Sequence, residues 1–97
     1  MLAIAAGRVV GFIIGSVTVE PGLVHGIVGR VEDWYVADGY RGSGIGRDLY
    51  YELEQWLVEK HCDQVISDTW AGNELSINAH RLSGFFVSGI SFSKKLS

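Results

Sequence analysis

The sequence predicts an α+β protein with a mixed sheet, built in the order β-β-β-α-β-α-β. Three observations lead to this fold class. The first third of the chain is rich in Val, Ile and Phe, and turn residues interrupt it. Two later segments repeat apolar residues at helical spacing, and each of them follows a predicted strand. The length of 97 residues allows one domain, which we take to span residues 1–97.

Three strands are expected in the first third of the chain, at residues 2–6, 9–19 and 24–36. The turns between them are expected at Gly7-Arg8 and at Glu20-Pro21-Gly22. Gly26 and Gly29 are candidates for β-bulges in the third strand, because glycine weakens a regular strand.

The second half of the chain alternates helix and strand. A helix is expected from Ile45 to about Lys60-His61, because apolar residues recur along it at helical spacing. A strand follows from Gln64 to Trp70. Asn73 is a suitable N-cap for a second helix that ends near Ser83 with Leu75, Ala79 and Leu82 facing inward. Gly84 then ends this helix, and Phe85 to Leu96 is expected to close the sheet as one strand or a bent pair.

Composition and charge exclude several classes of protein. The net charge of −3 argues against non-specific binding to nucleic acid. No apolar run reaches the roughly 20 residues that span a bilayer, so no membrane partner is expected. The single cysteine, Cys62, excludes an intrachain disulfide, and His25 and His61 have no partner at metal-ligand spacing. We therefore expect a soluble cytoplasmic protein without a metal site.

The segment from Tyr40 to Arg47 has the composition of a phosphate-binding loop. It lies between a predicted strand and a predicted helix, and a helix N-terminus offers free backbone N–H groups with a partial positive charge. Glycine at positions 42, 44 and 46 lets an anion approach those groups. The Walker A and dinucleotide-binding patterns both fail, because Arg47 stands where each requires another residue. The alternative is a tight turn that binds no ligand.

The pattern Arg41-x-x-Gly44-x-Gly46 resembles the Arg/Gln-x-x-Gly-x-Gly/Ala loop of the GCN5-related N-acetyltransferases (the GNAT superfamily) at every fixed position. The run Ser67 to Asn73, with Ser76, His80 and Gly84-Phe85, is similar to bacterial aminoglycoside 6′-N-acetyltransferases. The run Glu32 to Val36, with Tyr40-Arg41-Gly42, resembles diamine acetyltransferases. The resemblance covers about residues 9–96 and implies a GNAT-like fold. The family places one strand and two helices before the hairpin that opens this chain, so an N-terminally shortened version is expected.

The resemblance implies acetyl-CoA as the cofactor. The strand residues Trp34, Tyr35 and Val36 would hold the pantetheine arm, through the backbone groups of Trp34 and Val36. Asn73 would contact the pantetheine or would only cap its helix. The backbone amides that would take the pyrophosphate are those of Arg41, Gly42, Ser43, Gly44, Ile45, Gly46 and Arg47.

In this family an amine attacks the thioester directly, so a base must take the proton of the amine. The resemblance makes Glu32 the candidate base, and its neighbours Val31 and Trp34 would give it an apolar setting. The alternative is a solvated carboxylate on an outward face of the strand. Strand alternation turns Asp33 to the opposite face unless a bulge intervenes, which makes it the weaker candidate. The N–H of Trp34 would stabilise the developing oxyanion.

Two further residues are catalytic candidates by resemblance. His80 stands where diamine acetyltransferases carry the tyrosine that protonates the leaving thiolate. The alternative is a histidine on the helix surface that bonds to a neighbour. Asp68 would attract a cationic acceptor or serve as an alternative base.

The resulting prediction is an acetyl-CoA-dependent N-acetyltransferase that acts on a primary amine of a small cationic acceptor, an aminoglycoside or a polyamine. The alternatives are a non-catalytic acyl-CoA-binding module and an enzyme that acetylates protein N-termini or lysines. A homodimer is also expected, in which the final strand, Phe85 to Leu96, pairs across subunits because an exposed sheet edge invites association.

Overall fold

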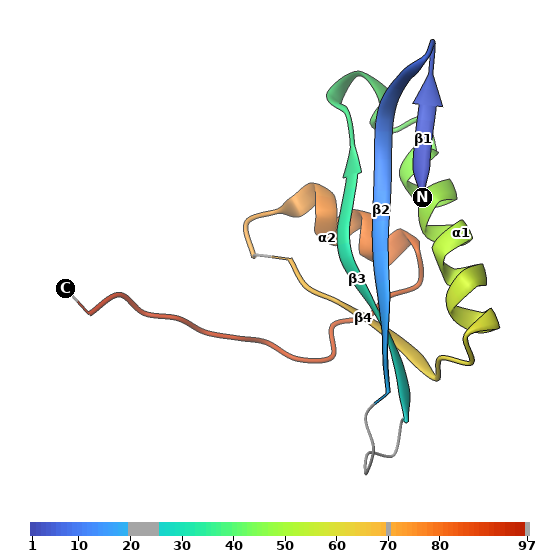
Figure 1. The fold of residues 1–97 in the computed structure, drawn as a ribbon. Coiled ribbons are helices and arrows are strands. Elements are labelled where there is room, and N and C mark those ends of the chain that lie inside the picture. Colours follow the sequence, from blue (N-terminus) through green and yellow to red (C-terminus); the bar gives the residue numbers. More distant parts are fainter. Residues whose placement is uncertain (20–25, 70, 97) are drawn as a thin grey trace.

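The computed structural model describes residues 1–19, 26–69 and 71–96 and contains a mixed sheet with two helices (Figure 1). The sheet has the order β1-β2-β3-β4, in which β1, β2 and β3 are antiparallel and β4 runs parallel to β3. This arrangement confirms the predicted fold class. Within those residues, neither helix combines the length and apolarity needed to cross a membrane. The elements are β1 (Leu2–Ala5), β2 (Arg8–Val19), β3 (Ile27–Val36), the 3-10 helix η1 (Asp38–Tyr40), α1 (Ile45–Glu59), β4 (Gln64–Ser67) and α2 (Glu74–Leu82).

The first hairpin turns one residue earlier than expected. Ala6 and Gly7 have φ angles of 50° and 75°, and Arg8 already belongs to β2. Two successive positive φ values are the requirement of the tight turns whose twist matches that of a hairpin. The predicted turn at Glu20-Pro21-Gly22 and the start of the third strand at Val24 lie outside the described residues.

Helix α1 packs along one face of the sheet and forms the core with it. The buried side chains that form one contiguous cluster are Ile13, Val31, Leu49, Tyr50, Leu53 and Leu57. The close approach depends on small residues in the strands, because a Cβ on Gly15 would stand 2.5 Å from Leu53 Cδ1 and one on Gly29 would stand 2.7 Å from Leu57 Cδ2. Gly29 therefore makes room for α1 and pairs regularly with Val17, so its prediction as a bulge is wrong.

The bulge of β3 lies at Glu32 instead. Ile14 pairs with Asp33 and Gly15 pairs with Val31, which leaves Glu32 as the extra residue. Val31 is buried in the core, and Trp34, three residues later, packs against the same core. Two exposed residues thus separate two inward ones, and Glu32 and Asp33 both lie outside the core. The alternation expected for Asp33 is interrupted by this bulge.

Strands β3 and β4 pair over only four residues. The pairing runs from Val28–Gln64 to Val31–Ser67 and then stops, because β4 ends at Ser67 while β3 continues to Val36. The expected strand to Trp70 is therefore shorter, and Trp70 itself lies outside the described residues. Beyond Val31, β3 has a partner on the β2 side and an open edge on the other.

The chain after α2 contains no strand in the described residues, so the expected strand from Phe85 to Leu96 is wrong for this structure. Gly84 ends the helix with a φ of 92°, as expected, and Phe85 packs against Tyr50 and His80. Phe86, Ile90 and Phe92 are exposed, and the segment leads away from the sheet (Figure 1). A strand needs hydrogen-bond partners along its length, and this segment has none from its own sheet.

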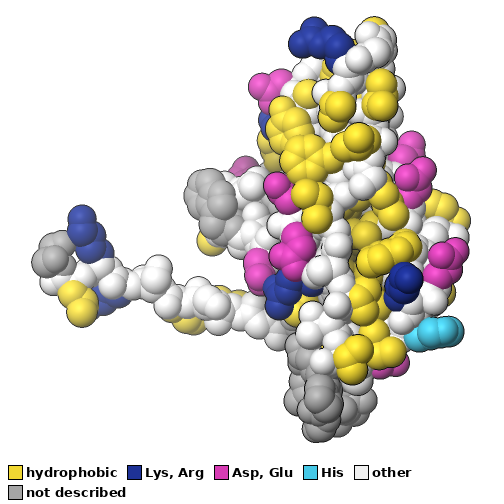
Figure 2. All heavy atoms as spheres, viewed as in Figure 1, with side chains coloured by type: hydrophobic (Ala, Val, Ile, Leu, Met, Phe, Trp, Pro, Cys, Tyr) yellow, Lys and Arg dark blue, Asp and Glu magenta, His cyan; other side chains and the backbone are white. Residues whose placement is uncertain are grey.

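The face of the sheet opposite α1 is open and partly apolar. Leu2, Ile14 and Tyr35 belong to β1, β2 and β3 and are exposed. Figure 2 shows hydrophobic side chains gathered over these strands, with acidic side chains beside them. The two helices thus cover one face of the sheet only, since both pack on the side of Ile13, Val31 and Trp34.

Candidate active site

A cleft of about 570 Å³ lies between the open edge of β3 and α2. Its walls come from the end of β3, the loop before α1, the first turn of α1 and one side of α2. The lining residues are Trp34, Tyr35, Val36, Tyr40, Arg41, Gly42, Gly44, Gly46, Arg47, Asn73, Leu75, Ser76, Asn78, Ala79, Leu82 and Ser83. The structure therefore brings together all the predicted cofactor-binding residues except Ser43 and Ile45, whose side chains contact the protein itself.

The N-terminus of α1 opens into this cleft without a side-chain cap. Gly44 is the N-cap residue with a φ of 90°, and Gly42 has a φ of 79°. The first backbone N–H bonded within the helix is that of Asp48, which donates to Gly44 O at 3.0 Å. The N–H groups of the first three helical residues lie before it and have no helical partner, as in every α-helix. Uncapped donors beside glycines at positive φ form a site for an anionic group such as a phosphate.

Arg41, the first position of the loop motif, holds the loop together. Its Nε donates to Val36 O at 3.0 Å, and its Nη1 forms an ion pair with Asp38. Ser43 Oγ also donates to the carbonyl oxygen of Tyr40. The side chains of Arg41 and Ser43 thus fix the path of the backbone from β3 to α1. Of the amides predicted to bind the pyrophosphate, that of Arg41 already donates to Asp38 O at 3.4 Å.

The open edge of β3 presents backbone groups to the cleft. Ala37 N donates to Val10 O at 2.8 Å, and Ile13, which lies opposite Trp34, exchanges two hydrogen bonds with Met1 on its other side. Because antiparallel residues alternate in the direction of their backbone groups, those of Trp34 and Val36 point away from β2. The N–H of Trp34 donates to Asp33 Oδ1 at 2.9 Å.

The side chain of Trp34 connects the three walls of the cleft. Its Nε1 donates to Gly46 O at 3.1 Å, which ties β3 to the first turn of α1. Its ring centroid lies 5.6 Å from that of Tyr50 and 5.2 Å from that of His80, with His80 edge-on. Trp34 thereby sets the position of α1 and α2 relative to the open strand edge.

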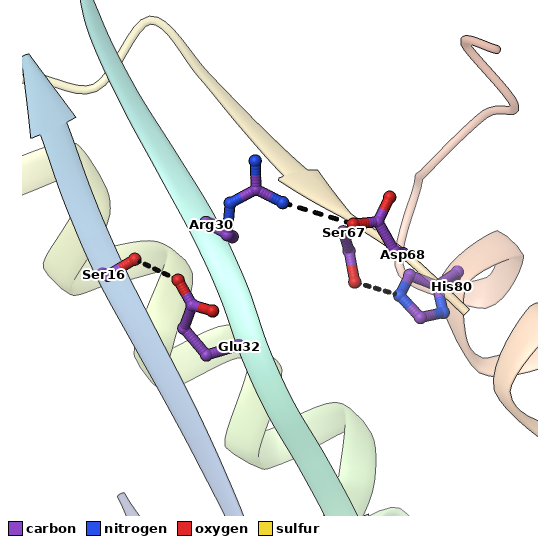
Figure 3. A network of polar contacts seen from close by, with 6 residues as sticks. All are labelled: Ser16, Arg30, Glu32, Ser67, Asp68 and His80. Atoms are coloured by element: carbon purple, nitrogen blue, oxygen red, sulfur yellow. Dashed lines mark hydrogen bonds and ion pairs between the residues drawn. The ribbon is translucent and has the colours of Figure 1, made fainter. Parts of the chain in front are cut away.

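Glu32, the predicted base, lies on the exposed bulge of β3. Its Oε1 accepts a hydrogen bond of 2.6 Å from Ser16 Oγ, as Figure 3 shows. The expected apolar setting is wrong, because the bulge turns this carboxylate out of the core and into solvent. Glu32 is not among the residues that line the cleft.

His80 lies behind the cleft wall, between α2 and the end of β4. Its Nδ1 is 2.7 Å from Ser76 O, and its Nε2 is 2.7 Å from Ser67 Oγ (Figure 3). A carbonyl oxygen only accepts, so Nδ1 carries a proton, and in the neutral ring Nε2 accepts from Ser67. Both nitrogens of His80 are therefore engaged inside the protein.

Asp68, the third catalytic candidate, follows the end of β4 and forms an ion pair with Arg30 of β3. The distance from Asp68 Oδ2 to Arg30 Nη1 is 3.3 Å, and both side chains are exposed (Figure 3). Like Glu32 and His80, Asp68 is not among the lining residues of the cleft. The three catalytic candidates thus surround the end of the β3–β4 pairing without meeting at one point.

The sequence model of the acetyltransferase (GNAT) family matches residues 1–85 of this chain. The chain belongs to the GNAT acetyltransferase family. A curated relative, the aminoglycoside N(6′)-acetyltransferase type 1 of Stenotrophomonas maltophilia, is 36% identical over 89 residues, which are 87% of this chain and 57% of the relative. The glucosamine 6-phosphate N-acetyltransferase of Trypanosoma brucei brucei is 35% identical over 81 residues, covering 81% of this chain and 52% of its own length. The chain spans about half the length of these curated relatives.

Solved structures of GNAT acetyltransferases have the same fold as this chain. The aminoglycoside N-acetyltransferase AAC(6′)-Iy in complex with CoA is 26% identical and superposes with a TM-score of 0.85, over 99% of this chain and 74% of the solved one. A second structure of AAC(6′)-Iy, in complex with the bisubstrate analogue CoA-S-monomethyl-acetylneamine, gives a TM-score of 0.83 at 26% identity. This match covers 99% of this chain and 67% of the solved one. The GNAT-like fold that the loop motif implied is therefore confirmed.

Asn73 both caps α2, as predicted, by accepting a 3.1 Å hydrogen bond from Ser76 N, and lines the cleft. The structure also adds cleft residues on α2 that sequence reasoning missed. Leu75 and Leu82 were expected to face inward, but they are exposed and line the cleft on the GNAT scaffold. The prediction that these two side chains face inward is wrong, because the apolar spacing of α2 marks the side that faces the cleft and not one buried in the core.

Two titratable groups in the core have altered acidity. Burial, together with the hydrogen bond and the negative charge of Glu54, raises the pKa of Tyr50. Burial and the neighbouring Asp63 raise the pKa of the Cys62 thiol. In the residues that the structure describes, no three His, Cys, Asp or Glu side chains gather as metal ligands would.

Proposed function

We propose that this chain is an acetyl-CoA-dependent N-acetyltransferase that acts on a primary amine of a small cationic acceptor of the aminoglycoside type. The observation that carries the proposal is the uncapped N-terminus of α1, with Gly42 and Gly44 at positive φ, beside the open edge of β3. The relatives named above support the reaction and the class of acceptor.

The cleft fits acetyl-CoA through three groups of its own atoms. The N–H groups of Ile45, Gly46 and Arg47 would hold the pyrophosphate, where no side chain competes for them. The carbonyl oxygen of Trp34 and the N–H of Val36 would pair with the pantetheine arm along the open strand edge. The Trp34 N–H would stabilise the negative charge that develops on the acetyl oxygen. When bound, the cofactor supplies an acetyl group activated as a thioester.

Glu32 remains the proposed base. Its carboxylate is exposed on the bulge, two residues from Trp34, and it carries a negative charge toward an acceptor cation. Ser16 fixes its orientation through the 2.6 Å hydrogen bond. Asp68 is less suited to attract a cation by itself, because Arg30 offsets its charge.

His80 is best assigned to positioning. It fastens α2 to β4 through Ser67 and carries its Nδ1 proton to a carbonyl of its own helix, so it has no free N–H for the cleft. The predicted role as general acid requires the side chain to leave both bonds. A thiolate can depart without an acid, so the reaction does not depend on that change.

We also propose a homodimer. The apolar side chains of Phe86, Ile90 and Phe92 are exposed on an extended tail, and the outer edge of β4 has no partner strand within the described residues. A tail that pairs with that edge in a second copy would bury these side chains and satisfy the backbone of both. Light scattering checks this, since a monomer at micromolar concentration would contradict it.

The first test is a calorimetric titration of acetyl-CoA into the protein, with CoA and ATP as comparison ligands. Micromolar binding of both CoA species with much weaker binding of ATP would support the cleft assignment. Failure of a demonstrably folded protein to bind any of them would leave the loop as a turn and remove the proposal.

The second test is a panel of amines assayed by the release of CoA thiol. Turnover with an aminoglycoside or polyamine supports the leading proposal, and turnover only with peptide N-termini or lysines supports the protein-acetylating alternative. Binding of acetyl-CoA without any turnover would favour a non-catalytic acyl-CoA-binding module. Glu32→Gln should then abolish turnover and spare binding if Glu32 is the base, whereas equal rates would exclude it.

A further inference from the structure

The carboxylate of Asp33 is hydrogen-bonded to the Trp34 N–H, the backbone donor that would stabilise the acetyl oxygen in the proposed reaction. Its Oδ1 accepts the Trp34 N–H at 2.9 Å, and that N–H points to the open edge of β3 rather than to β2. The edge is open there because the pairing with β4 stops at Val31–Ser67. A side chain of the strand itself thus fills the position of a missing neighbour strand.

We infer that Asp33 competes with the acetyl carbonyl for the Trp34 N–H, so that it masks this donor in the free protein and must leave it when acetyl-CoA binds. The inference rests on the proposed function, because it assigns the acetyl oxygen to that N–H. It gives Asp33 a specificity role that none of the motifs predicts: it lowers the preference of the cleft for acetyl-CoA over CoA.

The direction of the effect follows from the two acceptors. A carboxylate is a stronger hydrogen-bond acceptor than a neutral thioester carbonyl, so displacing it costs free energy. Asp33 is exposed, so water solvates the displaced carboxylate and limits that cost. CoA has no acetyl oxygen and leaves the Asp33–Trp34 hydrogen bond intact. The competition therefore weakens the binding of acetyl-CoA and leaves that of CoA unchanged.

The bulge at Glu32 makes this contact possible. A regular strand would turn Asp33 to the face opposite Glu32, whereas the extra residue keeps both carboxylates outside the core. Glu32 is engaged with Ser16 and has no bond to a backbone N–H of the open edge. The two neighbouring carboxylates thus have separate hydrogen-bond partners. A Glu32 variant therefore serves as a control for the loss of negative charge in an Asp33 variant.

The test compares the dissociation constants of acetyl-CoA and CoA by calorimetry in the full chain and its variants. Asp33→Ala frees the Trp34 N–H and should raise the preference for acetyl-CoA over CoA by about threefold to tenfold, the range of a single net hydrogen bond. Asp33→Asn keeps a weaker, neutral acceptor and should give an intermediate ratio. Glu32→Ala removes a neighbouring charge without touching the N–H, so it should leave the ratio unchanged.

The outcomes separate this inference from the proposed function. An unchanged ratio in Asp33→Ala, with both ligands still bound, overturns the competition and leaves the cleft assignment standing. An equal rise in Glu32→Ala also overturns it, because the effect would then be one of charge alone. Absence of binding for both ligands in the wild-type protein overturns the inference together with the proposed function. Asp33 is exposed, so its variants retain the core, and near-ultraviolet circular dichroism verifies this.

Discussion

The indole Nε1 of Trp34 donates a 3.1 Å hydrogen bond to the backbone oxygen of Gly46. This bond joins the open edge of β3 to the first turn of α1, the two parts of the molecule that would hold the pantetheine arm and the pyrophosphate. The distance between these two binding regions therefore depends on one side chain. A change at Trp34 is expected to affect the affinity for the whole cofactor more than for either end.

Trp34→Phe keeps an aromatic ring against Tyr50 and His80 but removes the donor to Gly46 O. We expect the free energy of unfolding to fall by about 1 kcal/mol, the net value of one hydrogen bond. The dissociation constant for CoA should rise, while that for a small pyrophosphate analogue stays close to the wild-type value. Urea denaturation and calorimetry measure the two effects, and an equal loss for both ligands would show that the loop itself has been disrupted.

Gly44 and Gly46 are the two glycines of the loop motif, but only Gly44 has a backbone conformation that requires glycine. Gly44 lies at a φ of 90°, so Gly44→Ala should cost about 1 kcal/mol of stability and weaken CoA binding. Gly46 lies in the first turn of α1, and a Cβ there would be 3.4 Å from Val36 Cγ2, a contact that a small shift relieves. Gly46→Ala should therefore change stability by less than about 0.5 kcal/mol. Thermal unfolding of both variants tests the contrast, and equal losses would contradict it.

The loop and its flanking elements could be predicted from the sequence because local rules determine them. Helix α1 begins at Ile45 as its apolar spacing indicates, and Asn73 caps α2 as an N-cap residue should. The glycines at 42 and 44 take the positive φ values that their residue type allows. The nine cleft-lining residues among the predicted cofactor ligands follow from this local geometry.

The errors concern features that tertiary contacts decide. The bulge at Glu32 arises where β3 must keep both Val31 and Trp34 against α1, and no residue type in that run marks the extra position. The residues after Gly84 include Phe, Val and Ile, which strands favour, but a strand forms only where another edge accepts its hydrogen bonds. The direction of His80 depends on Ser67, thirteen residues away, and the spacing within its own helix gives no sign of that bond.

His80→Phe tests whether His80 positions α2 or acts in catalysis. Phenylalanine retains the ring contacts with Trp34 and Phe85 and loses the bonds to Ser67 and Ser76. We expect a loss of about 2 kcal/mol in the free energy of unfolding, from two hydrogen bonds, and a higher KM for acetyl-CoA. The pH profile of kcat should keep its shape.

A general acid contributes about 100-fold to 10,000-fold to a rate. A fall of kcat by that amount in folded His80→Phe, with a lost limb in the pH profile, would restore His80 as the acid. His80→Asn offers a second readout, because its side-chain amide can replace one of the two hydrogen bonds but cannot transfer a proton at neutral pH. If His80→Asn is more stable than His80→Phe but its kcat stays equally low, His80 acts as the general acid.

Tyr50 makes the stability of the core depend on alkaline pH. Burial, the hydrogen bond of 3.0 Å to Glu54 Oε1 and the charge of Glu54 all favour the protonated phenol, so the pKa of Tyr50 is raised above the ordinary tyrosine value of about 10. The folded state then binds a proton that the unfolded state has released. By linkage, this contribution to stability is fully present below about pH 10 and is lost as the pH rises further.

The wild-type free energy of unfolding should fall by about 1 kcal/mol more between pH 8 and pH 11 than that of Tyr50→Phe. Tyr51→Phe is the matched control, because Tyr51 is the next residue of α1 and its side chain is exposed. Urea denaturation at a series of pH values measures the difference. If Tyr50→Phe and Tyr51→Phe lose stability with the same slope as the wild type, Tyr50 ionises in the folded protein as it does in the unfolded chain, and burial against Leu53 and Phe85 does not protect its proton.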